Sequence, residues 1–279
     1  MFGSFPRRTK SWDSYNESGG ESLKILVTND DGIKAPGIRT LRDKLKEVAE
    51  IIVAAPAQQQ SATGHSITVY HPIWVNEYQF DDSRISGWKI GGTPADSVKI
   101  ALDTLMTEKP DLVVSGINQG PNLATDVLYS GTVSAAVEGA MHGIPAIAIS
   151  LASYDSPDFS AAADFCCSLV EQFKAGKLPK FSLLNVNVPA GPADEIKGVS
   201  VTRLGSIEYE NAFEKRTDPH GRTYYWMAGT PTQGNNTADT DVAAIEQGMI
   251  SVTPIHFDLT DYALLDELRN WNRGNGKSV

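Results

Sequence analysis

The sequence predicts an α/β protein built on a Rossmann-like, mostly parallel sheet flanked by helices. Short apolar runs rich in Val, Ile and Ala recur along the chain, and such runs are typical of parallel strands buried on both faces. Between several of them lie stretches whose apolar residues follow helical spacing. The 279 residues are enough for one large domain of this kind with an extension.

The alternation begins at residue 23. Residues 23–28 predict a first strand, residues 38–48 a helix, and residues 51–55 a second strand that is closed by Pro56. Because the connection is a short helix, the two strands should be parallel and joined by a right-handed crossover.

A second helix is expected to begin after Thr93. Thr93 can serve as its N-cap, Pro94 suits the first helical position, and Asp96 completes a pattern like a capping box. The same alternation then continues with strands at 112–115, 144–150 and 182–188 and helices at 131–142 and 161–173.

Two parts of the chain depart from this rhythm. Residues 67–75 and 88–90 are predicted as strands of an antiparallel excursion. Beyond residue 190, the region around Tyr209 and residues 223–227 and 250–254 predict β-hairpins, residues 229–241 a polar loop, and residues 262–271 a terminal helix. We therefore expect three parts: a poorly ordered or added extension (1–22), a Rossmann-like catalytic core (23–190), and a β-rich oligomerisation arm (191–279).

Composition restricts the partners. The net charge of −10 argues against a long nucleic acid, because a polyanion would be repelled. The apolar runs are too short to span a bilayer, so no membrane partner is expected. No apolar segment follows the N-terminal basic residues, and Cys166 and Cys167 are adjacent in a predicted helix. Both features favour a protein with packed free thiols in the cytoplasm.

The first strand ends in two adjacent carboxylates, Asp30 and Asp31, between Asn29 and Gly32. The carboxyl ends of parallel strands are where open α/β sheets bind ligands. Neighbouring carboxylates repel each other unless a cation lies between them, and a hard divalent cation is the usual one. The alternative is a solvated turn, since all four residue types favour turns.

Loops after two other strands are expected at the same edge of the sheet. The second strand is followed by Ser61, Thr63 and His65, and the 112–115 strand by a loop that contains Asn118. Carboxylate and amide oxygens suit Mg²⁺ or Mn²⁺, which makes Asp30, Asp31 and Asn118 candidate ligands. Chemistry alone does not distinguish Ser61 from its neighbours.

The helix at 131–142 begins with a small polar run, Ser130, Gly131 and Thr132. The free N–H groups and the dipole of a helix start can bind phosphate, although Ser and Thr are also common N-caps without any ligand. The sequence contains no P-loop, no Gly-x-Ser-x-Gly and no Gly-x-Gly-x-x-Gly after the first strand. Kinase-like, serine hydrolase and dinucleotide-binding functions thus lose their main support.

These segments together resemble the survival protein E (SurE) family of metal-dependent 5′/3′-nucleotidases. The matching segments are Leu-Val-Thr-Asn-Asp-Asp-Gly at 26–32, Ala-Pro-Ala-Gln-Gln-Gln-Ser at 55–61, Gly-Gly-Thr-Pro-Ala-Asp-Ser-Val at 91–98, Pro-Asp-Leu-Val-Val-Ser-Gly-Ile-Asn at 110–118 and Tyr-Ser-Gly-Thr-Val-Ser-Ala-Ala-Val-Glu-Gly at 129–139, with weaker matches at 184–189 and 250–254. They cover most of residues 23–260 in the family's order, which is more specific than any single motif.

The resemblance implies one divalent metal ion per subunit, Mg²⁺ or Mn²⁺, on Asp30, Asp31, Ser61 and Asn118. It also implies homodimers or homotetramers built by the C-terminal extension. We expect Asp30 and Asp31 to be catalytic. The expected phosphate and substrate contacts are Asn29, Ser130, Gly131 and Thr132.

The expected reaction is hydrolysis of nucleoside 5′-monophosphates, with 3′-monophosphates left open, to nucleoside and phosphate. One alternative is a non-catalytic sensor that binds metal and nucleotide. Another is a broad acid phosphatase or exopolyphosphatase that uses the same site on other substrates.

Overall fold

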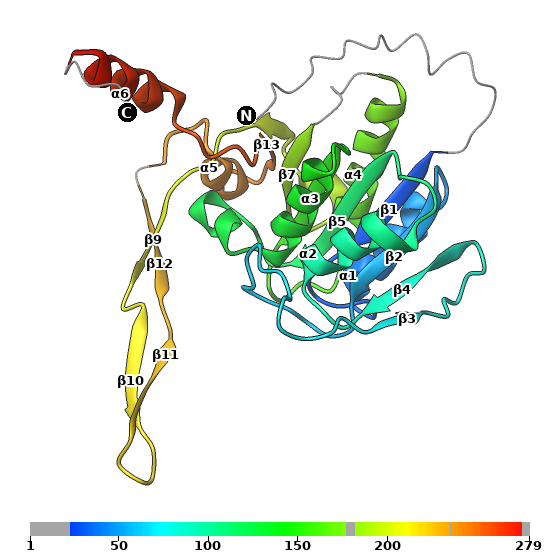
Figure 1. The fold of residues 1–279 in the computed structure, drawn as a ribbon, viewed down its shortest axis with the longest axis horizontal. Helices are drawn as coiled ribbons and strands as arrows, with labels where there is room; N and C mark the ends of the chain where they lie inside the picture. Colours follow the sequence, from blue (N-terminus) through cyan, green and yellow to red (C-terminus); the bar gives the residue numbers. More distant parts are fainter. Residues whose placement is uncertain (1–22, 177–181, 235, 275–279) are drawn as a thin grey trace.

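The computed structural model describes residues 23–176, 182–234 and 236–274, in which helices cover both faces of a central sheet (Figure 1). The predicted extension over residues 1–22 lies outside the described residues. Among the described helices, none is long and apolar enough to cross a membrane.

The described strands of the main sheet run in the order β3-β4-β2-β1-β5-β6-β7-β13-β8. From β4 to β7 the neighbouring strands are parallel, whereas β3 is antiparallel to β4, and β13 is antiparallel to β7. The strands are β1 (Lys24–Thr28), β2 (Glu50–Pro56), β3 (Val75–Glu77), β4 (Ile85–Ile90), β5 (Leu112–Gln119), β6 (Ala146–Ala152), β7 (Leu183–Pro189), β8 (Val199–Val201) and β13 (Ile250–Pro254).

The helices are α1 (Pro36–Leu45), α2 (Pro94–Ile100), α3 (Gly131–Met141), α4 (Ser160–Lys174), α5 (Asp241–Glu246) and α6 (Tyr262–Gly274), with shorter turns η2 (Ala101–Leu105), η3 (Ala124–Leu128) and η4 (Ala193–Glu195). The predicted start of α2 is confirmed, since Thr93 and Asp96 form a capping box and Pro94 occupies the first turn. The backbone N–H of Asp96 donates to the Thr93 hydroxyl at 3.0 Å, which satisfies one of the free donors of a helix start.

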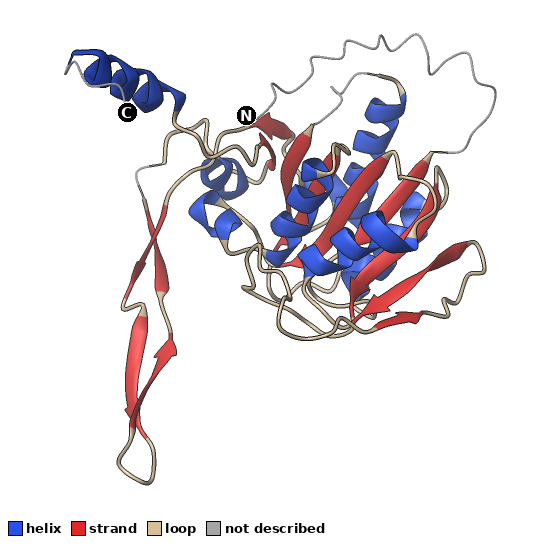
Figure 2. Ribbon diagram, in the orientation of Figure 1, coloured by secondary structure: helices blue, strands red, loops and turns tan. Residues whose placement is uncertain are grey.

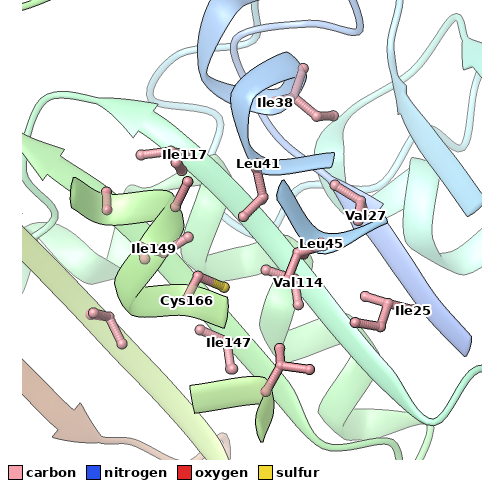
Figure 3. Packing of buried hydrophobic residues seen from close by; sticks show 14 of the residues in the cluster. Ile25, Val27, Ile38, Leu41, Leu45, Val114, Ile117, Ile147, Ile149 and Cys166 are labelled. Carbon is pink, nitrogen blue, oxygen red and sulfur yellow. The ribbon is translucent and has the colours of Figure 1, made fainter. Parts of the chain in front are cut away.

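Side chains along each strand point alternately to the two faces of the sheet, and one pair of helices, α1 and α4 or α2 and α3, covers each face (Figure 2). Ile25 and Val27 of β1 pack in a cluster with α1 and α4, whereas Leu26 between them packs in a cluster with α2 and α3. Figure 3 shows the first cluster, in which Leu41 and Cys166 approach the sheet from their helices. The two clusters make the protein a three-layer α/β structure, as predicted, and Cys166 is a buried free thiol within it.

The strand order reverses direction next to β1. From β1 the chain crosses to β2 and β4 on one side, and it then returns to place β5 on the other side of β1. Such a switch point separates the loops that leave the carboxyl ends of the two strands and opens a crevice between them. The loop after β1 and the end of β5 meet at this point.

Two predicted strands of an antiparallel excursion are wrong in detail. Residues 67–74 form no strand, and β3 is limited to Val75–Glu77. Tyr70 and Trp74 are largely exposed in this loop, so it lacks the buried face that holds a strand, and Pro72 has no N–H for a ladder. The 88–90 strand belongs to β4, which joins the main sheet parallel to β2.

In the C-terminal region the predicted strands around Tyr209 and at 223–227 are confirmed, whereas two other predictions are wrong. Residues 250–254 form β13 inside the main sheet, between β7 and β8, because nearly all of its side chains are buried. The predicted polar loop at 229–241 contains β12 (Thr230–Gln233), which pairs with β9 (Ile207–Glu210). With the hairpin of β10 (Phe213–Thr217) and β11 (Thr223–Met227), these strands form a long arm that leaves the body, and α6 also lies apart from the sheet (Figure 1).

Candidate active site

The turn after β1 is closed by Asn29. Its side-chain nitrogen donates to the Gly32 carbonyl at 3.0 Å, and its side-chain oxygen accepts from the Gly32 N–H at 3.2 Å. Gly32 has a φ of +97°, a backbone angle that residues other than glycine rarely adopt. Asn29 is fully buried, so the structure uses this predicted substrate contact to shape the turn that presents Asp30 and Asp31.

Asp30 is buried, with only 6% of its surface exposed, and accepts a hydrogen bond from the hydroxyl of Thr132 in α3. Burial is the main cause that raises the pKa of Asp30, to about 6; the nearby Asp31 raises it further, and the Thr132 hydroxyl opposes the shift. The backbone carbonyl of Asp30 also accepts from the Gln60 N–H at 2.7 Å. Asp30 therefore links the β1 turn to α3 and to the loop after β2.

Gly131 allows α3 to come this close to Asp30. A Cβ atom at position 131 would lie 2.7 Å from the Asp30 Cβ and 3.0 Å from the Cγ of Pro94. Real side chains do not approach at such distances, so only glycine fits here. The sequence predicted Gly131 as a phosphate contact; in the structure the group that packs against it is the Asp30 side chain.

Asp31 lies beside Asp30 and is more open to solvent. One carboxylate oxygen accepts from the backbone N–H of Gln119 at 3.1 Å, and the other from the side-chain amide of Gln59 at 3.3 Å. Burial raises the pKa of Asp31, against the effect of these two hydrogen bonds. The contact with Gln119 holds Asp31 against β5 at the switch point of the sheet.

Of the other predicted ligands, Ser61 is linked to Asp31 through Gln59, and Asn118 adjoins the residue whose N–H contacts Asp31. The amide nitrogen of Gln59 also donates to the Ser61 hydroxyl at 2.9 Å, so Asp31 and Ser61 share one hydrogen-bond donor. Asn118 directly precedes Gln119 and donates its side-chain nitrogen to the Gly120 carbonyl at 2.8 Å. This bond leaves the amide oxygen of Asn118 free of hydrogen bonds from the described residues.

A shift of register accompanies Asn118. Ser115 pairs with Ala148 and Asn118 with Ser150, so β5 contains one residue more than β6 over this stretch. Asn118 consequently belongs to β5 and not to the loop in which the sequence placed it. Bulges of this kind re-aim side chains next to active sites.

The donor set fits a hard divalent cation. Two carboxylates, a hydroxyl and an amide oxygen are ligands suited to Mg²⁺ or Mn²⁺. Within the described ranges, no cluster of three or more His, Cys, Asp and Glu side chains could hold a metal, so the site relies on Ser and Asn oxygens beside the carboxylates. The Gln59 amide donates to both Asp31 and Ser61 and so links two of the candidate ligands.

The side chains at the start of α3 are already engaged within the protein. The Ser130 hydroxyl accepts from the Val133 N–H at 3.1 Å as the N-cap of α3, and Thr132 is fully buried against Asp30. The structure thus brings Thr132 to the carboxylates, while a role for Ser130, Gly131 and Thr132 in phosphate binding stays a prediction.

Sequence reasoning did not single out Gln59, which stands in one of the matching segments but in a run of three identical residues. It also missed the partner of His65. The imidazole of His65 lies 2.8 Å from the carboxylate of Glu138 in α3, whose side chain is 3% exposed. The signal available in the sequence was a single acidic residue among the small and apolar residues of the helix predicted at 131–142.

Glu138 also lies 3.5 Å from Lys99 and 3.5 Å from His142. Burial, the largest influence, raises its pKa, but the hydrogen bond from His65 and the charges of Lys99 and the two histidines outweigh it and lower the pKa overall. Glu138 therefore anchors the loop that carries Ser61 and His65 to α3.

The fold and the site define an α/β protein with an acidic, cation-compatible centre at the switch point of its sheet. The model of the family "Survival protein SurE" matches residues 25–211. The chain belongs to the SurE family.

Relatives and a solved structure agree with this assignment. A 5′-nucleotidase SurE from Pelotomaculum thermopropionicum is 53% identical over 248 residues, which cover 88% of this chain and 94% of the relative. A 5′-nucleotidase SurE from Thermosynechococcus vestitus is 52% identical, with 90% and 97% covered. The crystal structure of the SurE protein from Aquifex aeolicus is similar with a TM-score of 0.77 and 39% identity, covering 89% and 99%.

Proposed function

We propose that this chain is a 5′-nucleotidase, a metal-dependent phosphomonoesterase that converts nucleoside 5′-monophosphates to nucleoside and phosphate. The observation that carries the proposal is the pair of adjacent carboxylates, Asp30 and Asp31, fixed by neutral donors at the switch point of the sheet. The names of relatives about half identical to this chain support the substrate class.

We propose that Asp30, Asp31, Ser61 and Asn118 hold one Mg²⁺ or Mn²⁺ ion per subunit. A divalent ion of this kind polarises phosphoryl oxygens and lowers the pKa of a bound water. The protein's own contribution is orientation: Thr132 holds Asp30, and Gln119 and Gln59 hold Asp31. Either carboxylate can then orient or deprotonate the attacking water.

The positive end of α3 lies beside this centre, because Thr132 in its first turn contacts Asp30. A helix start stabilises negative charge, including charge that develops on phosphoryl oxygens. We propose that Asn29 shapes the turn that presents the two carboxylates and that the α3 start, at Ser130, Gly131 and Thr132, faces the phosphoryl group.

The test is phosphate release from AMP and GMP with Mn²⁺, Mg²⁺ or EDTA. The wild type should need metal for activity. Asp31→Asn should lose at least about a hundredfold in turnover, because the substitution removes a negative charge that holds the metal and an oxygen that orients the water. Asp155→Asn, at an exposed carboxylate in the loop after β6, is the matched control and should retain full activity. Full activity in Asp31→Asn would contradict the proposal.

The two alternatives give different results in the same assay. A non-catalytic sensor would bind AMP in the presence of metal without releasing phosphate. A broad acid phosphatase or exopolyphosphatase would release phosphate from sugar phosphates or short polyphosphates as readily as from AMP. A panel that also contains 3′-AMP measures the preference between 5′- and 3′-monophosphates.

We also propose that the protein forms homodimers or homotetramers through its C-terminal extension (191–279) and acts on small nucleotides in the cytoplasm. The arm is exposed along β10 and β11, and it carries Tyr225 and Trp226 at 60% and 59% exposure. Exposed apolar surface of this kind marks interaction sites. Sedimentation analysis should show an oligomer for the wild type and a smaller species for Tyr225→Ser/Trp226→Ser. Identical masses would contradict a role of the arm in oligomerisation.

A further inference from the structure

A polar cavity has a lining that begins at Ile33, directly after the acidic turn, and contains none of the candidate ligands. It has a volume of about 280 Å³ and opens between the start of α1 and the connection from β3 to β4. Its lining includes Lys34, Arg39 and Arg42 on the α1 side and Tyr78, Phe80 and Asp81 on the other. None of Asp30, Asp31, Ser61 and Asn118 belongs to it.

The charge of this cavity is opposite to that of the protein. Three cationic side chains and one carboxylate line it, although the chain as a whole carries a net charge of −10. Lys34 and Arg39 are exposed, and neither forms an ion pair with a described residue. A concave surface with an excess of positive charge concentrates counter-ions, so the cavity should attract small anions.

Arg42 is held in place at the wall of the cavity. Its side chain is 7% exposed, its guanidinium carbon lies 5.0 Å from the centre of the Phe80 ring, and it donates a hydrogen bond to Asp81. The Phe80 ring is itself fixed by an edge contact with Tyr78, with ring centres 4.8 Å apart. The guanidinium is therefore positioned before any ligand arrives.

The carboxylates leave the hydrogen-bonding capacity of Arg42 incompletely used. The Asp81 side chain, which accepts from Arg42, is itself 71% exposed. The Nε atom of Arg42 lies 3.5 Å from the Asp43 carboxylate but has no hydrogen-bond partner. A guanidinium has five N–H donors and no acceptor. Burying such a group is costly unless acceptors surround it.

We propose that this cavity is a binding site for a small phosphate-bearing anion, held by Lys34, Arg39 and Arg42. Phosphate fits better than a monocarboxylate because it presents several oxygens and a double charge to cations that reach it from separate positions. The volume exceeds that of a bare phosphate ion, which leaves room for a small group such as a sugar. The source is either free phosphate or a phosphate monoester.

The experiment measures binding to metal-free protein in EDTA, in which the candidate metal centre is not assembled. The melting temperature is followed against inorganic phosphate, and separately against ribose 5-phosphate, with chloride replaced at constant ionic strength. A ligand that binds only the native state raises the melting temperature in a saturable way. We expect saturation in the wild type, and a tighter midpoint for ribose 5-phosphate would identify the monoester as the ligand.

The variant Lys34→Ala/Arg39→Ala should weaken this binding by at least about tenfold, because two charge-assisted contacts are lost. The matched control is Lys109→Ala/Lys174→Ala, which removes the same charge from two exposed lysines of the core. It should behave as the wild type does. Melting temperatures without phosphate and circular dichroism spectra establish that both variants fold.

Three results would overturn the inference. The first is a phosphate response that is linear and equal in all proteins, which is the general stabilisation by an excluded salt. The second is saturable binding that the Lys34→Ala/Arg39→Ala variant retains. The third is binding that Asp31→Asn abolishes, which would place the anion at the candidate active site. Since no turnover is measured, failure of the nucleotidase proposal and failure of this one are separate outcomes.

Discussion

Asp30 and Asp31 are neighbours in sequence but occupy different environments. Asp30 is buried against Thr132, whereas Asp31 lies in a more open position between Gln59 and Gln119. Burial raises the pKa of both, and neither forms an ion pair with a described residue. Two carboxylates held together by neutral donors alone are compensated best by an added cation.

The raised pKa of Asp30 predicts how metal binding depends on pH. Protonation competes with the metal, so the affinity for Mn²⁺ should rise with pH up to about 6 and then level off. In metal-free protein the folded state holds this proton more tightly than the unfolded state does, so stability should fall as pH rises from about 4 to about 6. Mn²⁺ titrations by calorimetry at several pH values, on wild type and Asp30→Asn, test the pH dependence of the metal affinity. An affinity in the wild type that does not change with pH would contradict it.

The Thr132 hydroxyl is predicted to orient a metal ligand. Thr132→Val removes the donor to Asp30 while keeping the shape, and it should weaken Mn²⁺ binding by about 10- to 100-fold, as losses of such supporting hydrogen bonds do. Thr132→Ser keeps the hydroxyl and should recover most of the affinity. If Thr132→Val instead raises the KM for AMP with unchanged Mn²⁺ affinity, the hydroxyl contacts the substrate.

At the scale of elements, the loop after β2 is attached to two helices. Its His65 pairs with Glu138 of α3, and the Gly64 N–H donates to the Tyr129 carbonyl at 2.9 Å. Thr68 donates from its backbone N–H to Asp96 of α2 at 3.0 Å. These contacts order a loop without regular structure, and that loop also carries Ser61.

Breaking the contact at Glu138 should loosen this loop. Glu138→Gln removes a buried charge that faces His65, Lys99 and His142, and should cost about 2 kcal/mol of stability at pH 7. Because the pKa of Glu138 is lowered in the fold, its stabilising contribution is present above the unfolded pKa and is lost as pH falls through the folded pKa.

Urea unfolding at pH 7 and at pH 4 measures both effects, and hydrogen exchange locates the loosened loop. The control is Glu108→Gln, which breaks the ion pair of a largely exposed carboxylate with Lys24 and should cost less than about 1 kcal/mol. Equal losses in the two variants at pH 7 would show that the contact at Glu138 does not anchor the loop.

At the scale of the whole molecule, stability resides in the two apolar layers on either side of the sheet. Leu41 of α1 is fully buried in the first layer (Figure 3). Leu41→Ala should therefore lower the free energy of unfolding by about 2–5 kcal/mol through lost burial and the cavity left behind. Leu259→Ala, at a position 86% exposed, should change it by less than about 0.5 kcal/mol. Urea denaturation compares the two variants.

Local signals in the sequence were sufficient for the strands and helices of the core. The capping pattern at Thr93 and Asp96 and the apolar run of Ile25, Leu26 and Val27 depend on neighbouring residues, and the structure contains both the capping box and the buried strand. The loop after β2 and the C-terminal strands were harder to predict. Whether residues 67–74 or 250–254 join a sheet depends on partners far away in the chain.

The sequence by itself determined the class of fold, the acidic turn at Asp30 and Asp31, and a resemblance that extended the candidate ligands to Ser61. These depend on residue types and short spacings, which act over a few residues. Only the tertiary structure decided that Thr132, Gln59 and the Gln119 N–H hold the two carboxylates. It also decided that β13 completes the main sheet. Such contacts join residues about thirty to a hundred positions apart, and packing of the whole chain selects them.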